Sequence, residues 1–103
     1  MEVSISNKEL EKLYTTGKSA KLKLPGQVID KYFATIQKII AARDIHDLWN
    51  DRGLNFEKLT GTENIYSMRL SGKYRLEMEV NWNDEQQITG SFVLKKISNH
   101  YKD

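Results

Sequence analysis

The apolar residues of this chain follow a helical period in its first half and a two-residue period in its second half. Between positions 28 and 40 they recur three and four residues apart, which predicts one long core helix that ends near Arg43. Pro25 suits the first turn of this helix, because the N–H that proline lacks would have no partner there. The residues that carry the period are Val28, Ile29, Tyr32, Phe33, Ile36, Ile39 and Ile40.

Shorter elements are expected on both sides of this helix. Alternation over residues 2–6 predicts a short strand, and Ser6 or Asn7 then caps a short helix that Gly17 ends. After the long helix, Asp44 is expected to cap a further helical turn.

The residues after this second cap combine charge with two large apolar side chains. His46 lies beside Asp47 in an acidic turn, and we interpret it as structural. Leu48 and Trp49 are expected to fold back onto the core, with Trp49 in the core or at its edge.

Alternation of inward and outward positions dominates the second half of the chain. Ser71-Gly72 is a plausible tight turn that joins two of the expected strands into a hairpin. We therefore predict a single α+β domain over residues 1–103, in which two N-terminal helices pack on an antiparallel sheet. The expected strands of the second half cover residues 65–70, 74–80 and 88–97.

Composition excludes several classes of protein. The chain has 103 residues, no cysteine and two histidines, so disulfide frameworks, thiolate zinc sites and cysteine nucleophiles are excluded, and a histidine-built metal site is not expected. No apolar run approaches the ~18 residues that span a membrane, and the charged start does not resemble a signal peptide. We expect a cytoplasmic protein without a metal or another cofactor.

The net charge of +2 is too small for a general nucleic-acid binder. Its distribution is uneven, because Lys18, Lys21 and Lys23 lie in a stretch without acids, and lysines recur near the C-terminus. A locally basic face and ordinary mixing of surface charges both remain open on this pattern.

Arg69 and Arg75 are the residues most suggestive of chemistry. The expected alternation places both on the same outward face of the hairpin, close enough for their side chains to meet. Two guanidiniums repel each other unless an anion lies between them. That anion is either a neighbouring carboxylate, Glu77 or Glu79, or the phosphate of a ligand.

Several short motifs occur in an order that is more specific than any one of them. They are Thr16-Gly17, Pro25, Val28, Lys31, Asp47-Leu48, FEKLTG at 56–61, YSMRLSGKYRL at 66–76 and SNHY at 98–101. In this order the chain resembles the HigB-type toxins of the RelE/ParE superfamily, which belong to bacterial type II toxin–antitoxin modules. The resemblance covers most of the chain, and its most specific parts are the arginine hairpin, the Leu-x-Gly element before it and the histidine near the end.

This resemblance implies a RelE-like fold and a metal-independent mRNA endonuclease that cuts translated messages on the ribosome. A HigA-like antitoxin would silence it, and the toxin alone would be a monomer. In such cleavage the 2′-hydroxyl of the RNA attacks the adjacent phosphate. The protein assists removal of that proton, stabilises the phosphorane charge and protonates the leaving 5′-oxygen.

The resemblance also suggests roles for individual residues. It implies that Arg75 stabilises the transition-state charge, that Arg69 holds the scissile or a neighbouring phosphate, and that His100 is a general acid or base. Glu57 stands where many members carry a histidine and could replace it as the base. The expected RNA contacts are Lys58, Lys73, Lys95, Lys96 and Tyr101, of which Tyr101 could stack on a base.

The chain departs from the family pattern in two places. Besides Glu57, Thr60 replaces a lysine, and Ser98-Asn99 replaces Asp-Tyr before the final histidine. Two alternatives therefore remain beside the endonuclease. One is a ParE-like protein that poisons DNA gyrase without cutting RNA, and the other is an inactive toxin fold that serves as a regulatory module.

Overall fold

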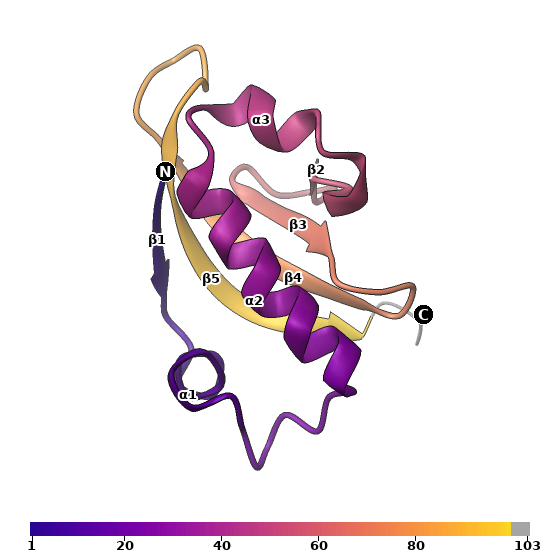
Figure 1. Cartoon of the computed structure of the whole chain (residues 1–103). Coiled ribbons are helices and arrows are strands. Elements are labelled where there is room, and N and C mark those ends of the chain that lie inside the picture. The colour runs from indigo at the N-terminus through magenta and orange to yellow at the C-terminus, as the bar shows by residue number, and fades with distance from the viewer. Residues whose placement is uncertain (100–103) are drawn as a thin grey trace.

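The computed structural model describes residues 1–99 of the chain. Their five strands form one sheet in the order β1-β5-β4-β3-β2 (Figure 1). Three helices together with this sheet confirm the α+β class. The strands are β1 (Glu2–Ile5), β2 (Glu57–Lys58), β3 (Ile65–Arg69), β4 (Tyr74–Trp82) and β5 (Gly90–Asn99). The helices are α1 (Lys8–Thr16), α2 (Gly26–Ala41) and α3 (Ile45–Trp49), followed by the 3-10 turn η1 (Arg52–Leu54).

The sheet is mixed, so the expectation of an antiparallel sheet was wrong at one edge. Strands β2 to β5 pair antiparallel, but β1 pairs with β5 in parallel, with Val3 opposite Phe92. A parallel pair needs a long crossover connection, and here that connection contains the helices and three other strands. Alternation over residues 2–6 predicted the strand correctly but held no information on its direction or partner.

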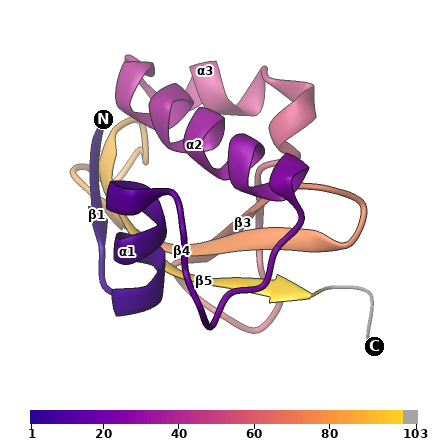
Figure 2. The same ribbon diagram turned by 60° about the horizontal axis from the view of Figure 1, so that its bottom comes forward.

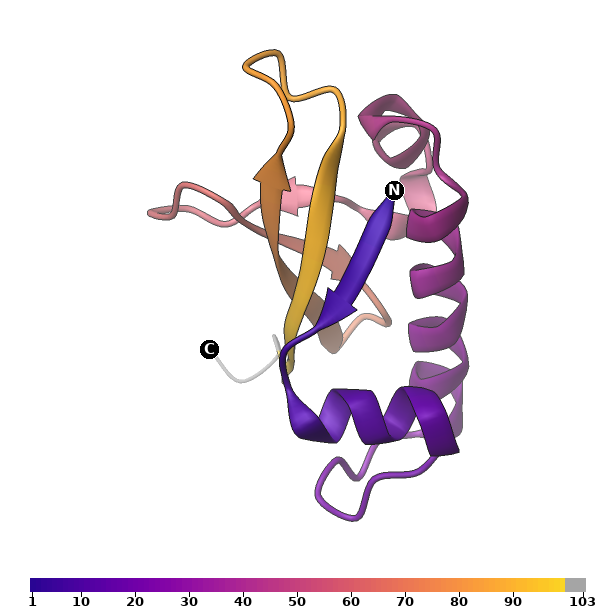
Figure 3. The same ribbon diagram turned by 90° about the vertical axis from the view of Figure 1, so that its left-hand side faces the viewer.

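Two helices cover one face of the sheet. α2 and α3 both lie on the same side (Figure 2), and the opposite side carries no helix over residues 1–99 (Figure 3). We call this opposite side the open face. Strand alternation and register place on it the polar side chains of Glu57, Ser67, Arg69, Arg75, Glu77, Glu79, Lys96 and Ser98.

The core lies between α2 and the sheet, as the helical period predicted. One stripe of α2 is buried, including Tyr32, whose hydroxyl donates a 2.8 Å hydrogen bond to the carbonyl of Leu10 on α1. Burial raises the pKa of Tyr32, so this hydroxyl stays protonated and remains a donor. Ile40 falls outside the stripe and is 48% exposed, which corrects its assignment to the core.

The helix ends follow the local chemistry closely. The Asn7 side chain accepts from the N–H groups of Glu9 and Leu10, and Gly17 ends α1 with φ 77°, both as predicted. Pro25 lies one position earlier than expected, at the N-cap of α2 rather than in its first turn. α2 ends at Ala41, slightly before the predicted limit, because the backbone is already extended at Ala42.

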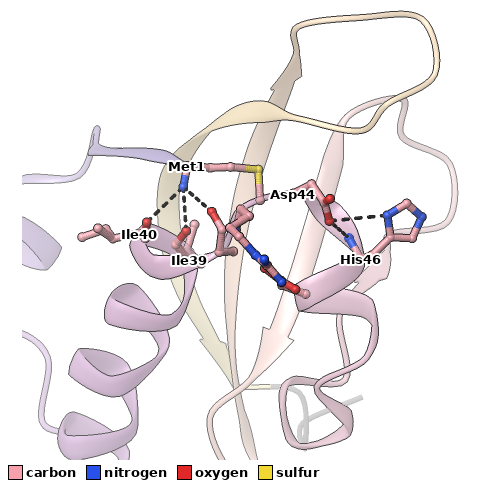
Figure 4. A network of polar contacts seen from close by, with 8 residues as sticks. Met1, Ile39, Ile40, Asp44 and His46 are labelled. Atoms are coloured by element: carbon pink, nitrogen blue, oxygen red, sulfur yellow. Dashed lines mark hydrogen bonds and ion pairs between the residues drawn. The ribbon is translucent and has the colours of Figure 1, made fainter.

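The C-terminal end of α2 is joined to the start of the chain (Figure 4). The Met1 ammonium donates to the carbonyls of Ile39, Ile40 and Ala42 at 3.0, 3.1 and 3.0 Å. These carbonyls lie at the C-terminal end of the helix, where a positive charge is favourable, and the Ile39 carbonyl also accepts from the Ala42 N–H at 3.2 Å. The contact fixes β1 beside α2.

The short helix α3 begins at the predicted cap. The Asp44 carboxylate accepts from the His46 N–H at 2.9 Å and lies 3.4 Å from His46 Nδ1 (Figure 4). Leu48 is buried as expected. Trp49 is 45% exposed and its ring contacts that of the buried Phe56 with centroids 4.4 Å apart, so it lies at the edge of the core, the second of the two expected positions.

An ion pair joins α2 to the segment after α3. Lys38 Nζ lies 2.9 Å from Asp51 Oδ2, and this hydrogen bond lowers the pKa of Asp51. A carboxyl whose pKa is lowered by folding stabilises the native state above its unfolded pKa, and that contribution disappears as the pH falls through the folded pKa. We therefore expect Asp51→Asn to lower the free energy of unfolding by less than about 1 kcal/mol at pH 7. Urea titrations should show that the difference in free energy of unfolding between the wild-type protein and Asp51→Asn shrinks below about pH 4. An equal difference at pH 7 and pH 3 would contradict a stabilising ion pair.

No helix in the part of the chain that the structure describes is long and apolar enough to cross a membrane.

Candidate functional site

The candidate site lies on the open face, on the hairpin formed by β3 and β4. Four residues connect the two strands rather than the two expected, and the Ser71 hydroxyl accepts from the N–H groups of Lys73 and Tyr74. Despite the longer turn, the register places Arg69 directly opposite Arg75. The prediction that both arginines share one face is confirmed.

The anion beside this pair is Glu57, not Glu77 or Glu79 as the sequence suggested. Arg75 Nη1 lies 3.2 Å from Glu57 Oε1. β2 brings the carboxylate there because it pairs with β3 and places Glu57 opposite Ser67. A strand of two residues has no measurable period, so this contact could not be predicted from alternation.

The two arginines differ in environment. The Arg75 side chain is only 15% exposed, although it lies on the face without helices. Arg69 is exposed and makes no ion pair with another residue of the described chain. Arg75 is thus held in place by its surroundings, whereas Arg69 remains available to an anion from solution.

Two serine hydroxyls near Arg75 were missed by the sequence analysis as site residues. Ser67 is fully buried and Ser98 lies opposite Arg75, and the Oγ atom of each is inaccessible with no hydrogen-bond partner in residues 1–99. Unpartnered buried hydroxyls are rare, because desolvation without a hydrogen bond costs free energy. The sequence signal for Ser67 was weak: a small polar residue between two core positions, of a kind that usually faces solvent.

Because of this cost, we expect Ser67→Ala to raise the free energy of unfolding by about 1 kcal/mol. Ser71→Ala is the matched control in the same hairpin, since the Ser71 hydroxyl accepts two backbone hydrogen bonds and its loss should destabilise by a similar amount. Urea unfolding of both variants measures the change in the free energy of unfolding, which should be a gain for Ser67→Ala and a loss for Ser71→Ala. A destabilised Ser67→Ala would show that its hydroxyl has a stabilising partner in the free protein.

The predicted RNA-binding lysines are not gathered in one place. Lys96 lies on the open face opposite Glu77, and Lys95 is the extra residue of a β-bulge, with its amine 3.3 Å from Glu79. Lys73 lies in the hairpin turn, 5.9 Å from the centre of the Tyr74 ring. These lysines are spread over the hairpin turn and β5 and two of them lie beside carboxylates, so the open face is not uniformly basic.

Lys58 points away from this group. It is exposed at the sheet edge, but its register partner is Tyr66, whose side chain faces the helices. In the loop between α1 and α2, Lys18, Lys21 and Lys23 are exposed and form no ion pair within the described chain.

His100 and Tyr101 lie outside the described residues. The last described residue, Asn99, pairs with Tyr74, which directly precedes Arg75 in the sequence. The β4–β5 pairing therefore brings the end of β5 to the arginine hairpin, as the expected meander implied.

A pocket of about 220 Å³ lies on the helix side of the molecule, away from the arginines. Its lining residues are Lys38, Ala41, Ala42, Asp47, Leu48 and Asp51. Hydrogen bonding to the Arg43 N–H lowers the pKa of Asp47, so this wall of the pocket is anionic at neutral pH. None of the predicted site residues lines it. Over residues 1–99, no group of three or more histidines and carboxylates is arranged to hold a metal ion.

The geometry can bind an oxyanion through Arg69 and Arg75, with a carboxylate beside them that can accept a proton. Comparison with known proteins adds no relative: none of the protein-family models matches the chain, and a search of curated proteins found no match.

Proposed function

We propose that this chain is the toxin of a bacterial type II toxin–antitoxin module, a ribosome-dependent mRNA endonuclease of the HigB type with a RelE-like fold. The observation that carries the proposal is Arg69 opposite Arg75 on the open face. Two adjacent guanidiniums bind the oxygens of a phosphate with directed, charge-assisted hydrogen bonds. The resemblance of the surrounding hairpin motif, at residues 66–76, supports the same function.

In this proposal the 2′-oxygen of the RNA attacks the adjacent phosphorus while the bond to the 5′-oxygen breaks. The products are a 2′,3′-cyclic phosphate and a free 5′-hydroxyl. Arg75 stabilises the added negative charge of the phosphorane, because its side chain is already held in place. Arg69 holds the scissile phosphate or its neighbour.

Two proton transfers complete the reaction. One group takes the 2′-hydroxyl proton and another protonates the leaving 5′-oxygen. We assign these transfers to Glu57, whose carboxylate lies beside Arg75, and to His100, a residue type whose charge changes near cellular pH. Tyr101 stacks on a base.

The partners in this proposal are the ribosome with its mRNA and a HigA-like antitoxin protein. Lys73, Lys95 and Lys96 contact the RNA backbone, and Lys58 does so at the sheet edge. The free toxin is a monomer that acts in the cytoplasm.

The experiment that tests this function is induced expression in a bacterial host without the antitoxin. Growth, the 5′ ends of cellular mRNAs and a DNA-damage reporter are followed together, for the wild-type protein and for Arg75→Ala at equal abundance. We expect growth arrest with in-frame cuts in translated messages, and we expect Arg75→Ala to lose both.

Each of the other two outcomes would favour one of the two alternative functions. Growth arrest with DNA damage and intact messages would assign the chain to gyrase poisons. Unimpaired growth with folded protein would favour an inactive toxin fold, and the Glu57 carboxylate on Arg75 would then be a reason for the lost activity.

A further inference from the structure

The Glu57 carboxylate is paired with the Arg75 guanidinium, the group that a bound phosphate would contact. Its Oε1 atom lies 3.2 Å from Arg75 Nη1, and the Glu57 side chain is 50% exposed whereas that of Arg75 is 15% exposed. The carboxylate is therefore the more accessible half of the pair. An anion that approaches this Nη1 atom from solution meets the negative charge of Glu57 first.

Glu57 lies on a short strand at the edge of the sheet, directly after the buried Phe56. β2 has two residues, lies at the edge of the sheet and pairs only with β3. A short edge strand with a single neighbour opens locally at a low free-energy cost. Arg75 lies instead on β4, between β3 and β5. When the pair separates, we therefore expect the half-exposed Glu57 side chain to move and Arg75 to stay.

Three groups near this pair have unused hydrogen-bonding capacity within residues 1–99. The buried Ser67 hydroxyl lies opposite Glu57, the Ser98 hydroxyl lies opposite Arg75, and neither has a partner. Arg69, on the other side of Arg75, has no ion pair. Arg69 would gain a partner if an oxyanion bound at Arg75 in place of the carboxylate, and the two inaccessible serine hydroxyls would gain one where the displacement of Glu57 uncovers them.

We propose that Glu57 is a displaceable counter-ion of Arg75, and that a phosphate of single-stranded RNA takes its place. This inference rests on the proposed function for the choice of RNA as the ligand. The exchange leaves the charge at Arg75 unchanged, because one singly charged anion replaces another. Its free energy is therefore set by contacts that only the RNA makes, such as those of its neighbouring phosphates with Arg69 and Lys96.

This arrangement makes Glu57 a specificity-determining residue. An isolated small anion gains only what Glu57 already provides, so it does not displace the carboxylate effectively. A chain of phosphates gains several contacts at once and does displace it. Glu57 thus lowers the affinity for all anions and favours those that carry several phosphates in sequence.

The test is the binding of a 2′-O-methyl RNA of about ten nucleotides, which lacks the nucleophilic hydroxyl, so binding is measured without cleavage. Fluorescence anisotropy of the labelled RNA gives Kd for the full-length protein and for Glu57→Gln. We expect Glu57→Gln to bind about tenfold more tightly, because the amide neither competes for Arg75 nor repels phosphate. Inorganic phosphate should compete with the RNA more effectively in Glu57→Gln than in the wild-type protein.

Glu77→Gln is the matched control. Glu77 lies in the same row of the open face, opposite Ser67, and forms no ion pair among residues 1–99. The substitution changes the net charge equally, so general electrostatics should tighten binding in both variants by a similar, smaller amount. The difference in RNA affinity between Glu57→Gln and Glu77→Gln measures the counter-ion effect. This difference should vanish when Arg75→Ala is added to each of the two variants.

Three results would overturn the inference. They are equal tightening by Glu57→Gln and Glu77→Gln, tightening that persists without Arg75, and no RNA binding by either the wild-type protein or Glu57→Gln. Equal unfolding midpoints in urea show that the variants are folded. The endonuclease proposal is tested separately by mRNA cuts in the induced host. If Glu57→Gln binds RNA more tightly in an Arg75-dependent way but no mRNA is cut in the host, only the endonuclease proposal is refuted. If mRNA is cut but Glu57→Gln does not bind RNA more tightly, only the counter-ion proposal is refuted.

Discussion

Replacing Phe92 by alanine is expected to lower the free energy of unfolding by about 3–5 kcal/mol. Phe92 is fully buried on β5, opposite Val3 on one neighbouring strand and Val80 on the other. Its ring centroid lies 6.1 Å from that of Phe56, so it also joins the sheet to the segment before β2. A domain of this size has only about 5–15 kcal/mol of stability, so the loss is a large fraction of the total.

The matched control is Val93→Ala, the next residue on the same strand. Val93 lies opposite Glu79 on the open face and is only partly buried, so its truncation should cost about 1 kcal/mol or less. Urea unfolding of both variants followed by circular dichroism gives the two values. A larger loss for Val93→Ala than for Phe92→Ala would mean that β5 faces the other way, which would also reverse the face of Ser98.

The parts of the fold that sequence predicted well are those whose signal is local. The α2 stripe with Tyr32 and Ile36 follows from spacing within one helix, and Asn7 and Gly17 are recognisable caps. Arg69 opposite Arg75 follows from alternation through a short hairpin, and a longer turn than expected did not change the register. In each case the residues that decide the structure are close in sequence.

The parts that sequence did not predict depend on distant pairings. β1 and β5 are joined across almost the whole chain, and nothing in residues 2–6 indicates a parallel partner. Glu57 reaches Arg75 only because β2 pairs with β3, and two residues carry no period. Sequence placed Glu57 in the site by resemblance alone, and the structure supplies the contact that gives it a physical role.

Burial on the open face was the least predictable property. Alternation assigns Ser67 and Arg75 to solvent, yet Ser67 is fully buried and Arg75 is 15% exposed. The reason is that long side chains on neighbouring strands cover a small one between them. Trp49 shows the converse: it is the last residue of α3, and although its ring contacts that of Phe56, its side chain stays 45% exposed.

Replacing Arg75 by alanine is expected to reduce mRNA cleavage by a factor of about 10² to 10³, the usual effect of removing one preorganised donor to a developing oxyanion. The fold should persist, because the lost ion pair has a half-exposed carboxylate that returns to water at a cost below about 1 kcal/mol. Primer extension on a reporter message in a cell-free translation system measures the cuts, and urea unfolding checks the fold.

Two further variants separate the chemistry of Arg75 from its charge. Arg75→Lys keeps the positive charge but loses the planar fork that contacts two oxygens, so it should recover only part of the activity. Arg52→Ala removes an exposed arginine outside the sheet and should leave cleavage unchanged. If Arg75→Ala cuts at the wild-type rate, the transition-state charge is stabilised elsewhere, and Arg69 becomes the arginine to replace next. If Arg75→Lys is fully active, Arg75 contributes only positive charge, and the role of its fixed guanidinium is refuted.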